Sequence, residues 1–448
     1  MTFIRRSARA NEKIASLPVS EPSKETKIMS ESAKAFIEDK FTQMFQETSV
    51  RRDKYNAVMN SPNLNQEEKE KILSQYAQEE SDFARKSRSK IKTSRFERIK
   101  LIGRGGFGEV WLVKDNEDRN FYALKVLRKA DIIMSEQIQN VRTERDILAH
   151  SDNPWFTYLN CSFQDEERLY LVLEYVCGGD LMNALIKKGV FDNDTAKFFI
   201  AEMTLAVHSV HELHFLHRDL KPDNVLITES GHIKLTDFGL SKNYQENDTR
   251  FQKLNDEIIE LISGRPLDRP FHDRGTEIGT CSYTAPEILI GKPPTTLSDF
   301  WSLGVILYEM LYGFVPFMGQ TSRETALRII AWKRCLVYPQ IEGHPVSPLA
   351  VDLLQHLLCD PEDRYGFEQI IVHPFFQGFD FDNPFSNSPP MVPVIKSPTD
   401  TSHFDEIEPS EQPLAASIPL ANISQFAFLG FTIKPKFSRI NRRIASVD

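Results

Sequence analysis

Four polar residues near the middle of the chain have the types and spacing that phosphoryl transfer requires. Asp219, in the run L-H-R-D at 216–219, could take or orient the proton of an attacking hydroxyl, and Lys221 could contact the phosphate in transit. Asn224 and Asp237 add amide and carboxylate oxygens, which are ligands that Mg²⁺ accepts. Any one of them alone would be an ordinary loop residue. Together they predict a catalytic loop followed by a metal-binding loop.

A glycine-rich loop upstream predicts a site for nucleotide phosphates. In G-R-G-G-F-G-E-V, Gly103, Gly105 and Gly108 have G-x-G-x-x-G spacing, which lets the backbone approach phosphates closely. Dinucleotide-binding loops share this spacing, but there a helix follows. Here the residues at 109–113 predict a strand, which disfavours a metabolic dinucleotide enzyme.

The rest of a nucleotide site is expected between two lobes. Lys125, in A-L-K, would bind the α- and β-phosphates and be held by Glu144 in the helical run V-R-T-E-R-D-I-L. A buried strand at 169–176 would lead to a hinge whose backbone at Glu174 and Val176 pairs with adenine. The apolar residues expected around the ring are Ile102, Val110, Ala123 and Leu226, with Leu173 behind it.

Length and composition exclude several classes. The 448 residues, 41% of them hydrophobic, have room for two or three domains, and the net charge of -9 argues against general nucleic-acid binding. Five widely spaced cysteines without a C-x-x-C pair favour a reducing compartment, the cytoplasm. We find no apolar run of about 18 to 20 residues that could span a membrane. Arg5, Arg6 and Arg9 are compatible with a mitochondrial presequence, but Glu12 favours a flexible arm.

The elements predicted along the chain begin with that flexible arm at 1–30. Two amphipathic helices follow at 31–92, with a break at 61–63, and their basic ends could dock an acidic partner or simply pack on the next domain. Strands begin near Phe96, and a mostly helical lobe begins near Phe191. A Pro/Ser-rich tail then ends in F-A-F-L-G-F-T-I-K, whose Phe428 and Phe431 are expected to plug an apolar pocket.

About 50 residues separate the Asp237 loop from A-P-E at 285–287. The extra stretch at 243–273 contains an amphipathic piece that could cover a groove. A phosphate on Thr276 could pair with Arg218 and Lys242 and order this loop. The residues expected to be structural are Asp299, bracing the catalytic loop, and Glu287, in a buried ion pair with Arg364.

Residues 96–376 resemble a eukaryotic protein kinase domain and, with the tail, the NDR/LATS family of the AGC group. The narrower match rests on three features: G-R-G-G-F-G-E-V-W-L with V-L-R-K-A-D and E-R-D-I-L, the long stretch before Thr276, and the tail runs I-K-S-P-T-D-T-S-H-F-D-E and F-L-G-F-T-I-K. The resemblance covers about residues 31–437. It implies an α+β, bilobal kinase fold with a small β-rich N-lobe, a large helical C-lobe, an N-terminal helical hairpin and an AGC tail at 377–448 carrying a hydrophobic motif at 428–433.

The resemblance also implies a function: phosphoryl transfer from ATP with Mg²⁺ to Ser/Thr of protein substrates. It implies that Phe404 completes the adenine pocket, and that Thr276 and Thr432 are activating phosphosites, Thr432 being set by an upstream Ste20-like kinase. A MOB-type coactivator would bind the N-terminal helices through basic residues, namely Arg51, Arg52, Arg85 and Arg88. Family members act in cell division, polarity and growth control, so the nucleus and the division site join the cytoplasm as expected locations.

Two further points concern the substrate specificity and the alternative that the chain is a scaffold without catalytic activity. Acidic residues such as Asp180 and Asp223 are expected to bind basic side chains upstream of the target Ser or Thr in the substrate. Asp180 could also face the ribose. G-T-C-S-Y-T-A-P-E at 279–287 departs from the family's G-T-P-D-Y-I-A-P-E, which leaves the shape of the substrate platform open. Lys221 favours a Ser/Thr over a tyrosine kinase. A catalytically silent scaffold is the alternative, and the intact catalytic set argues against it.

Overall fold

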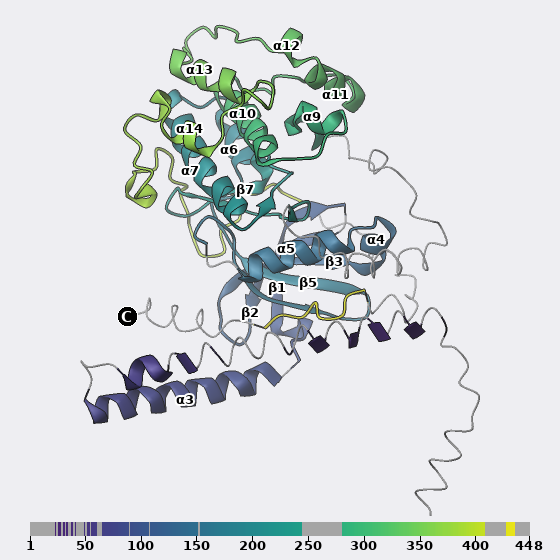
Figure 1. The fold of residues 1–448 in the computed structure, drawn as a ribbon, viewed down its shortest axis with the longest axis vertical. Helices are drawn as coiled ribbons and strands as arrows, with labels where there is room; N and C mark the ends of the chain where they lie inside the picture. The colour runs from purple at the N-terminus through teal and green to yellow at the C-terminus, as the bar shows by residue number, and fades with distance from the viewer. Residues whose placement is uncertain are drawn as a thin grey trace, which may run out of the picture.

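Two lobes make up the fold, a smaller one built on a β-sheet and a larger one built mainly of helices (Figure 1). The computed structural model describes residues 65–88, 90–106, 108–150, 153–243, 280–407 and 427–434, and short pieces between 23 and 60. The predicted arm and insert lie almost wholly outside the described residues, as do the tail parts at 408–426 and 435–448. The described lobes confirm the α+β bilobal fold.

An antiparallel sheet in the order β1-β2-β3-β5-β4 organises the small lobe. Alternating side chains divide between its faces: Leu171 belongs to the cluster that includes α5, whereas Val172 packs in an aromatic cluster on the other face. The strands and helices of this lobe are β1 Phe96–Gly105, β2 Gly108–Asp115, β3 Phe121–Arg128, α4 Lys129–Met134, α5 Ile138–His150, β4 Leu159–Gln164 and β5 Arg168–Glu174, preceded by the short η1 Thr93–Arg95. The predicted meander is confirmed.

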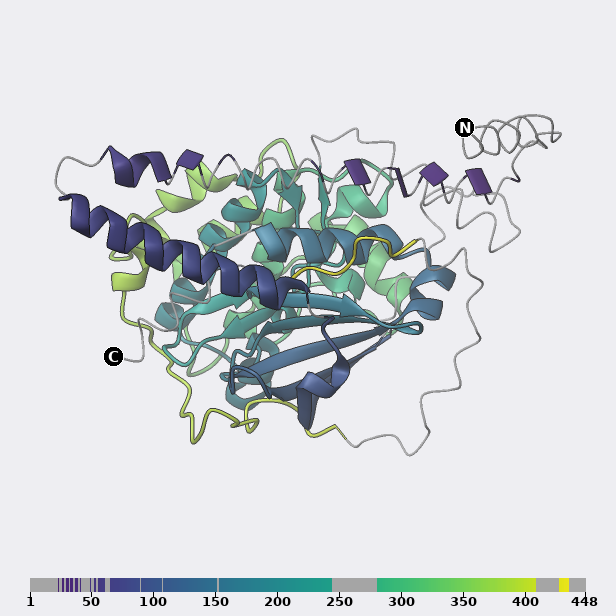
Figure 2. The same cartoon turned by 90° about the horizontal axis from the view of Figure 1, so that it is seen from below.

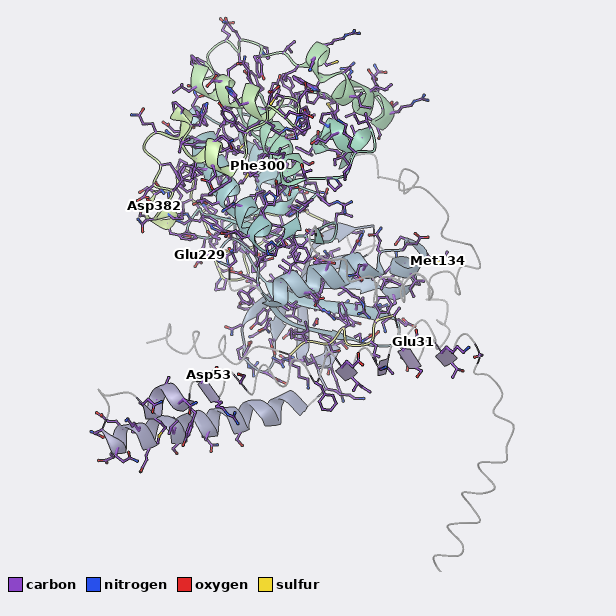
Figure 3. All side chains as sticks on the ribbon, in the orientation of Figure 1. Glu31, Asp53, Met134, Glu229, Phe300 and Asp382 are labelled. Carbon is purple, nitrogen blue, oxygen red and sulfur yellow. The ribbon has the colours of Figure 1, made fainter. Side chains whose placement is uncertain are left out.

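Long apolar helices form the centre of the large lobe. Phe300 in α10 is almost fully buried and lies deep among these helices, whereas Met134 in α4 points outward from the small lobe (Figure 3). The elements are α6 Leu181–Lys188, α7 Asn193–Glu212, β6 Phe215–Leu216, η2 Pro222–Asn224, β7 Val225–Ile227, β8 Ile233–Leu235, β9 Lys242–Asn243, η4 Thr280–Tyr283, α9 Pro286–Leu289, α10 Thr296–Tyr312, α11 Ser322–Ile330, α12 Trp332–Cys335, α13 Pro348–Leu357, α14 Phe367–Ile371, η5 Pro374–Phe376 and η6 Pro384–Ser386.

The predicted ion pair between Glu287 and Arg364 is present and buried. Arg364 Nη1 lies 2.6 Å from Glu287 Oε1, and Nη2 lies 3.1 Å from Oε2. Arg364 also donates to the carbonyls of Leu297 and Cys359. These four bonds hold both charged groups inside the lobe, although Nε of Arg364 has no partner among the described residues, and the pair ties A-P-E to the turn that follows α13.

Helix α3 (Gln66–Arg88) lies beyond the sheet, on the side away from the large lobe (Figure 1). Asn65 begins it with reciprocal hydrogen bonds: its Oδ1 accepts from the Glu68 amide, and Glu68 accepts from the Asn65 amide, each at 2.9 Å. The predicted second helix is therefore confirmed. The described residues 52–53 and 55–59 are also helical.

The end of the tail returns to the small lobe and lies beside α5 (Figure 2). Phe428 and Phe431 are fully buried there, as predicted. Ile433 pairs with Ser162 of β4 through two backbone hydrogen bonds, of 2.9 and 3.0 Å. The tail thus touches both lobes, since Phe385 of η6 also packs against His232 of the large lobe, with ring centroids 5.1 Å apart.

Candidate active site

The catalytic loop lies between β6 and β7 and brings three of the predicted residues together. Lys221 Nζ lies 3.0 Å from Asp219 Oδ2. Asn224 Nδ2 donates to the carbonyl of Asp219 at 2.8 Å and to its Oδ2 at 3.1 Å. Burial raises the pKa of Asp219, and the nearby Lys221 partly opposes that rise. The carboxylate is therefore held in one orientation beside a cation.

Asp299 fixes the backbone of this loop from α10, as predicted. Its Oδ2 accepts the amide of His217 and its Oδ1 accepts the amide of Arg218, each at 2.9 Å. His211 Nε2 lies 2.8 Å from the same carboxylate, a contact that the sequence did not predict. Arg218 has a φ of 68°, a conformation that costs a non-glycine residue about 1–2 kcal/mol. The hydrogen bonds to Asp299 hold that strained backbone in place.

Lys125, Glu144 and Asp237 meet between the lobes. Lys125 Nζ lies 2.7 Å from Glu144 Oε1 and 3.2 Å from Asp237 Oδ1. Burial alone would lower the pKa of Lys125, but the two neighbouring carboxylates together raise it. The charge of Lys125 in turn lowers the pKa of Asp237. Helix α5 is thereby tied to β3 and to the metal-binding loop.

Asp237 itself has a φ of 59°, and the aromatic ring after it stabilises that conformation. Phe238 is fully buried, packing edge-on against Phe156 with centroids 5.1 Å apart and against His217 at the same distance. Because Phe238 points into the core, the neighbouring carboxylate is turned toward Lys125.

The residues expected around adenine come from both lobes and from the segment that joins them. Ala123 faces Leu173 in the register of β3 and β5, and both are buried, as are Ile102 and Val176. The other two expected residues, Val110 and Leu226, are half-buried. Phe404, from the tail, stacks on Tyr175 of the hinge with centroids 5.8 Å apart.

The glycine loop joins β1 to β2, as predicted, and Gly103 pairs with Val110 across it. At Gly108 any side chain is excluded, because a Cβ would lie 1.8 Å from the carbonyl oxygen of Val126. At Gly105 a Cβ would meet no atom of the described residues within 4 Å. Gly108 is therefore required by the sheet itself, whereas no described residue restricts Gly105 in this way.

Asn224 and Asp237 offer a donor set that fits a divalent metal. Both hydrogen bonds that the structure gives the Asn224 side chain use its nitrogen, so its oxygen is the atom suited to a cation. Asp237, with its lowered pKa, stays ionised. Two oxygen ligands of this kind are what Mg²⁺ takes from proteins that also bind phosphates.

Asp180 has a structural role in addition to those predicted. Its carboxylate begins α6, accepting the amide of Asn183 at 2.7 Å and its side-chain nitrogen at 2.9 Å. Burial raises its pKa, and the charges of Asp223 and Asp405 raise it further. The three carboxylates are therefore near enough to interact, and they form one acidic region beside the start of α6.

Of the remaining predicted residues, those that the structure describes lie away from this centre. Thr432 is exposed beside the docked Phe431. Arg52 is exposed and helical, and Arg85 and Arg88 belong to α3. Thr276 and Arg51 lie outside the described residues.

Sequence reasoning missed the residues that receive the end of the tail. Lys129 is fully buried, donates to the carbonyl of Asp165 at 2.7 Å and lies 5.5 Å from the centroid of Phe428. Arg142 donates to the carbonyl of Ala427 at 2.6 Å, and Arg145 to that of Gly430 at 2.8 Å. No local pattern marks these residues, because their partners in the tail lie 285 or more positions away.

Comparison with known proteins places these observations in a family. A protein kinase domain model matches residues 96–376, more than half of the chain, and a protein kinase C terminal domain model matches residues 395–432. The probable serine/threonine-protein kinase ndrB of Dictyostelium discoideum is 40% identical over 424 residues, which cover 87% of this chain and 78% of that protein. Serine/threonine-protein kinase CBK1 of Pneumocystis carinii is 37% identical over 425 residues, covering 87% and 83%.

Serine/threonine-protein kinase LATS1 of Homo sapiens is 42% identical over 377 residues, or 78% of this chain, but this chain spans only 33% of that protein. The matched domain belongs to enzymes that use ATP and a divalent metal. None of the helices among the described residues is long and apolar enough to cross a bilayer. With a kinase domain, an AGC-type tail and relatives of this similarity, the chain belongs to the NDR/LATS family of serine/threonine protein kinases.

Proposed function

We propose that this kinase transfers the γ-phosphate of Mg-ATP to Ser/Thr residues that follow basic side chains in its protein substrates. The observation that supports this most directly is the convergence of Lys125, Glu144 and Asp237 beside the Asp219 loop. An enzyme that had become a silent scaffold would have no need to retain the strained backbone at Asp237.

Each residue is assigned one step. Asp219 orients the substrate hydroxyl and accepts its proton, and Lys221 neutralises charge on the transferred phosphoryl group. Lys125 binds the α- and β-phosphates, with Glu144 fixing its position. Asn224 and Asp237 hold the divalent metal, which when bound neutralises the phosphate oxygens. The hinge backbone at Glu174 and Val176 binds adenine, with Phe404 closing the pocket.

Substrate choice follows from the acidic region formed by Asp180, Asp223 and Asp405. Asp180, Asp223 and Asp405 influence one another electrostatically, so the region favours a cationic side chain. Basic residues upstream of the target Ser or Thr supply such a charge.

Regulation is proposed at three places. Phosphates on Thr276 and Thr432, the latter set by a Ste20-like kinase, would order the catalytic loop region and strengthen tail docking. A MOB-type protein would bind the helical region through Arg51, Arg52 and the basic end of α3. We propose a role in cell division, polarity or growth control, in the cytoplasm, nucleus or at the division site.

The test is transfer of phosphate from ATP to a Ser/Thr peptide library, with and without a MOB-type protein. We expect activity that favours upstream Arg or Lys and that Asp219→Ala lowers by at least about 10² to 10⁴-fold, because a positioned base contributes that much. Thr276→Ala and Thr432→Ala should each lower activity. Wild-type turnover in Asp219→Ala would refute the assigned chemistry. Wild-type turnover in both Thr276→Ala and Thr432→Ala would refute the proposed regulation by phosphorylation.

A further inference from the structure

An ion pair joins the hinge to the floor of the nucleotide pocket. Glu174 is the last residue of β5, and its carboxylate accepts from Lys234 Nζ at 2.8 Å to Oε1 and 2.6 Å to Oε2. The two side chains are only 21% and 19% exposed. With both oxygens engaged and most water excluded, this pair is held more firmly than a pair at the surface.

Each partner lies directly beside a part of the expected adenine pocket. Lys234 is the middle residue of β8, and its register partner in β7 is Leu226, which is expected to lie under the ring. Glu174 follows Leu173, and its backbone is expected to pair with adenine. The pair therefore connects the edge of the pocket to its floor.

Both ends are anchored to rigid neighbours. The amide of Glu174 donates to the carbonyl of Tyr158 at 3.0 Å, and the amide of Leu235, next to Lys234, donates to the carbonyl of Trp155 at 2.7 Å. Ile233 and Leu235, on either side of Lys234, are buried. Movement of the hinge relative to β7 and β8 thus requires the ion pair to stretch.

We propose that Lys234 is a positioning residue for the nucleotide: through Glu174 it sets the separation between the hinge backbone and Leu226, and so the fit of adenine. The proposal rests on the adenine site proposed above. Lys234 contacts neither phosphate nor substrate in this scheme, so its loss should weaken ATP binding while leaving the transfer step intact.

The experiment measures kcat and KM for ATP in Lys234→Met, Lys234→Arg and the exchanged double variant Glu174→Lys with Lys234→Glu. We expect KM for ATP to rise about tenfold in Lys234→Met, the size of one charge-assisted hydrogen bond, with kcat within twofold of wild type. Lys234→Arg and the double variant should regain most of the affinity. Lys333→Met, which removes an exposed pair with Asp360, is the matched control and should change neither constant.

Two results would overturn the proposal: an unchanged KM in Lys234→Met, or an equal loss in Lys234→Met and Lys234→Arg. A thermal unfolding curve for each variant identifies a loss that comes only from instability, which would lower the apparent kcat through a smaller folded fraction and leave KM unchanged. The variant Ala123→Leu distinguishes refutation of the positioning role of Lys234 from refutation of the proposed adenine site. If its added bulk leaves KM for ATP unchanged, adenine binds elsewhere; if it raises KM while Lys234→Met does not, only the positioning role is refuted.

Discussion

At the scale of single residues, the chemistry depends on one carboxylate held beside one cation. Burial raises the pKa of Asp219, and Lys221 opposes that rise. A carboxyl group must be ionised to accept a proton, so activity is lost as pH falls through its pKa. The raised pKa therefore places the acid limb of the rate profile at a higher pH than an exposed aspartate would give.

Lys221→Met should move that acid limb further toward neutral pH, because the substitution removes the cation that favours the ionised carboxylate. The measurement is kcat/KM for a peptide substrate as a function of pH at saturating ATP. Lys187→Met, an exposed lysine of α6, serves as the control and should leave the limb in place. A limb that stays fixed or moves to lower pH in Lys221→Met would contradict the assignment of Asp219 as the base.

At the scale of elements, the docked end of the tail stabilises α5 and β4 together. Phe431 is fully buried beneath Arg145, whose guanidinium lies 5.5 Å from the ring centroid, and the carbonyl of Phe431 accepts from Ser162 Oγ at 2.7 Å. Since α5 also carries Glu144, docking of the tail bears on the position of Lys125.

Phe431→Ala should release this segment, because a Phe→Ala change in a packed site costs about 3–5 kcal/mol, more than a short docked segment is expected to retain. Hydrogen exchange at α5 and β4 should then increase, and phosphotransfer should decrease. Val394→Ala, in the same tail but 77% exposed, should change neither. Unchanged exchange in Phe431→Ala would show that the segment is held by its backbone bonds alone.

At this scale, features of the structure that depend on neighbouring residues could be predicted from the sequence, whereas features that depend on distant residues could not. Alternation of apolar residues predicted β1 to β3, and Asn65 with Glu68 predicted where α3 begins, since both signals act within a few positions. Spacing within the motifs predicted the residues around Asp219. The Glu174–Lys234 pair and the arginines under the tail were not predicted, because their geometry depends on how distant segments pack.

At the scale of the whole molecule, charge is distributed unevenly. The chain carries a net charge of -9, yet the C-terminal end of α3 reads A-R-K-S-R. This basic run closes a helix that lies beyond the small lobe, so we expect a partner bound to the helix to leave the active site open (Figure 1).

Charge reversal at Arg85 and Arg88 should weaken binding of a MOB-type protein by about tenfold at low salt, with a smaller difference at high salt as the charges are screened. Titration calorimetry at two salt concentrations measures both effects. Reversal of Lys69 and Lys71, nearer the start of the same helix, is the control. If the variant reversed at Arg85 and Arg88 binds the MOB-type protein as tightly as the control variant does, the alternative is favoured that the hairpin packs on the kinase domain.

The pairing of Ile433 with Ser162 has a consequence for solubility. β4 is an outer strand of the sheet, and an outer strand with unpaired amides and carbonyls is a template for joining other chains. The returning tail takes up two of these groups and covers the neighbouring apolar surface. The docked residues 427–434 therefore also protect the small lobe from self-association. A variant that releases them should lose activity and should also aggregate more readily.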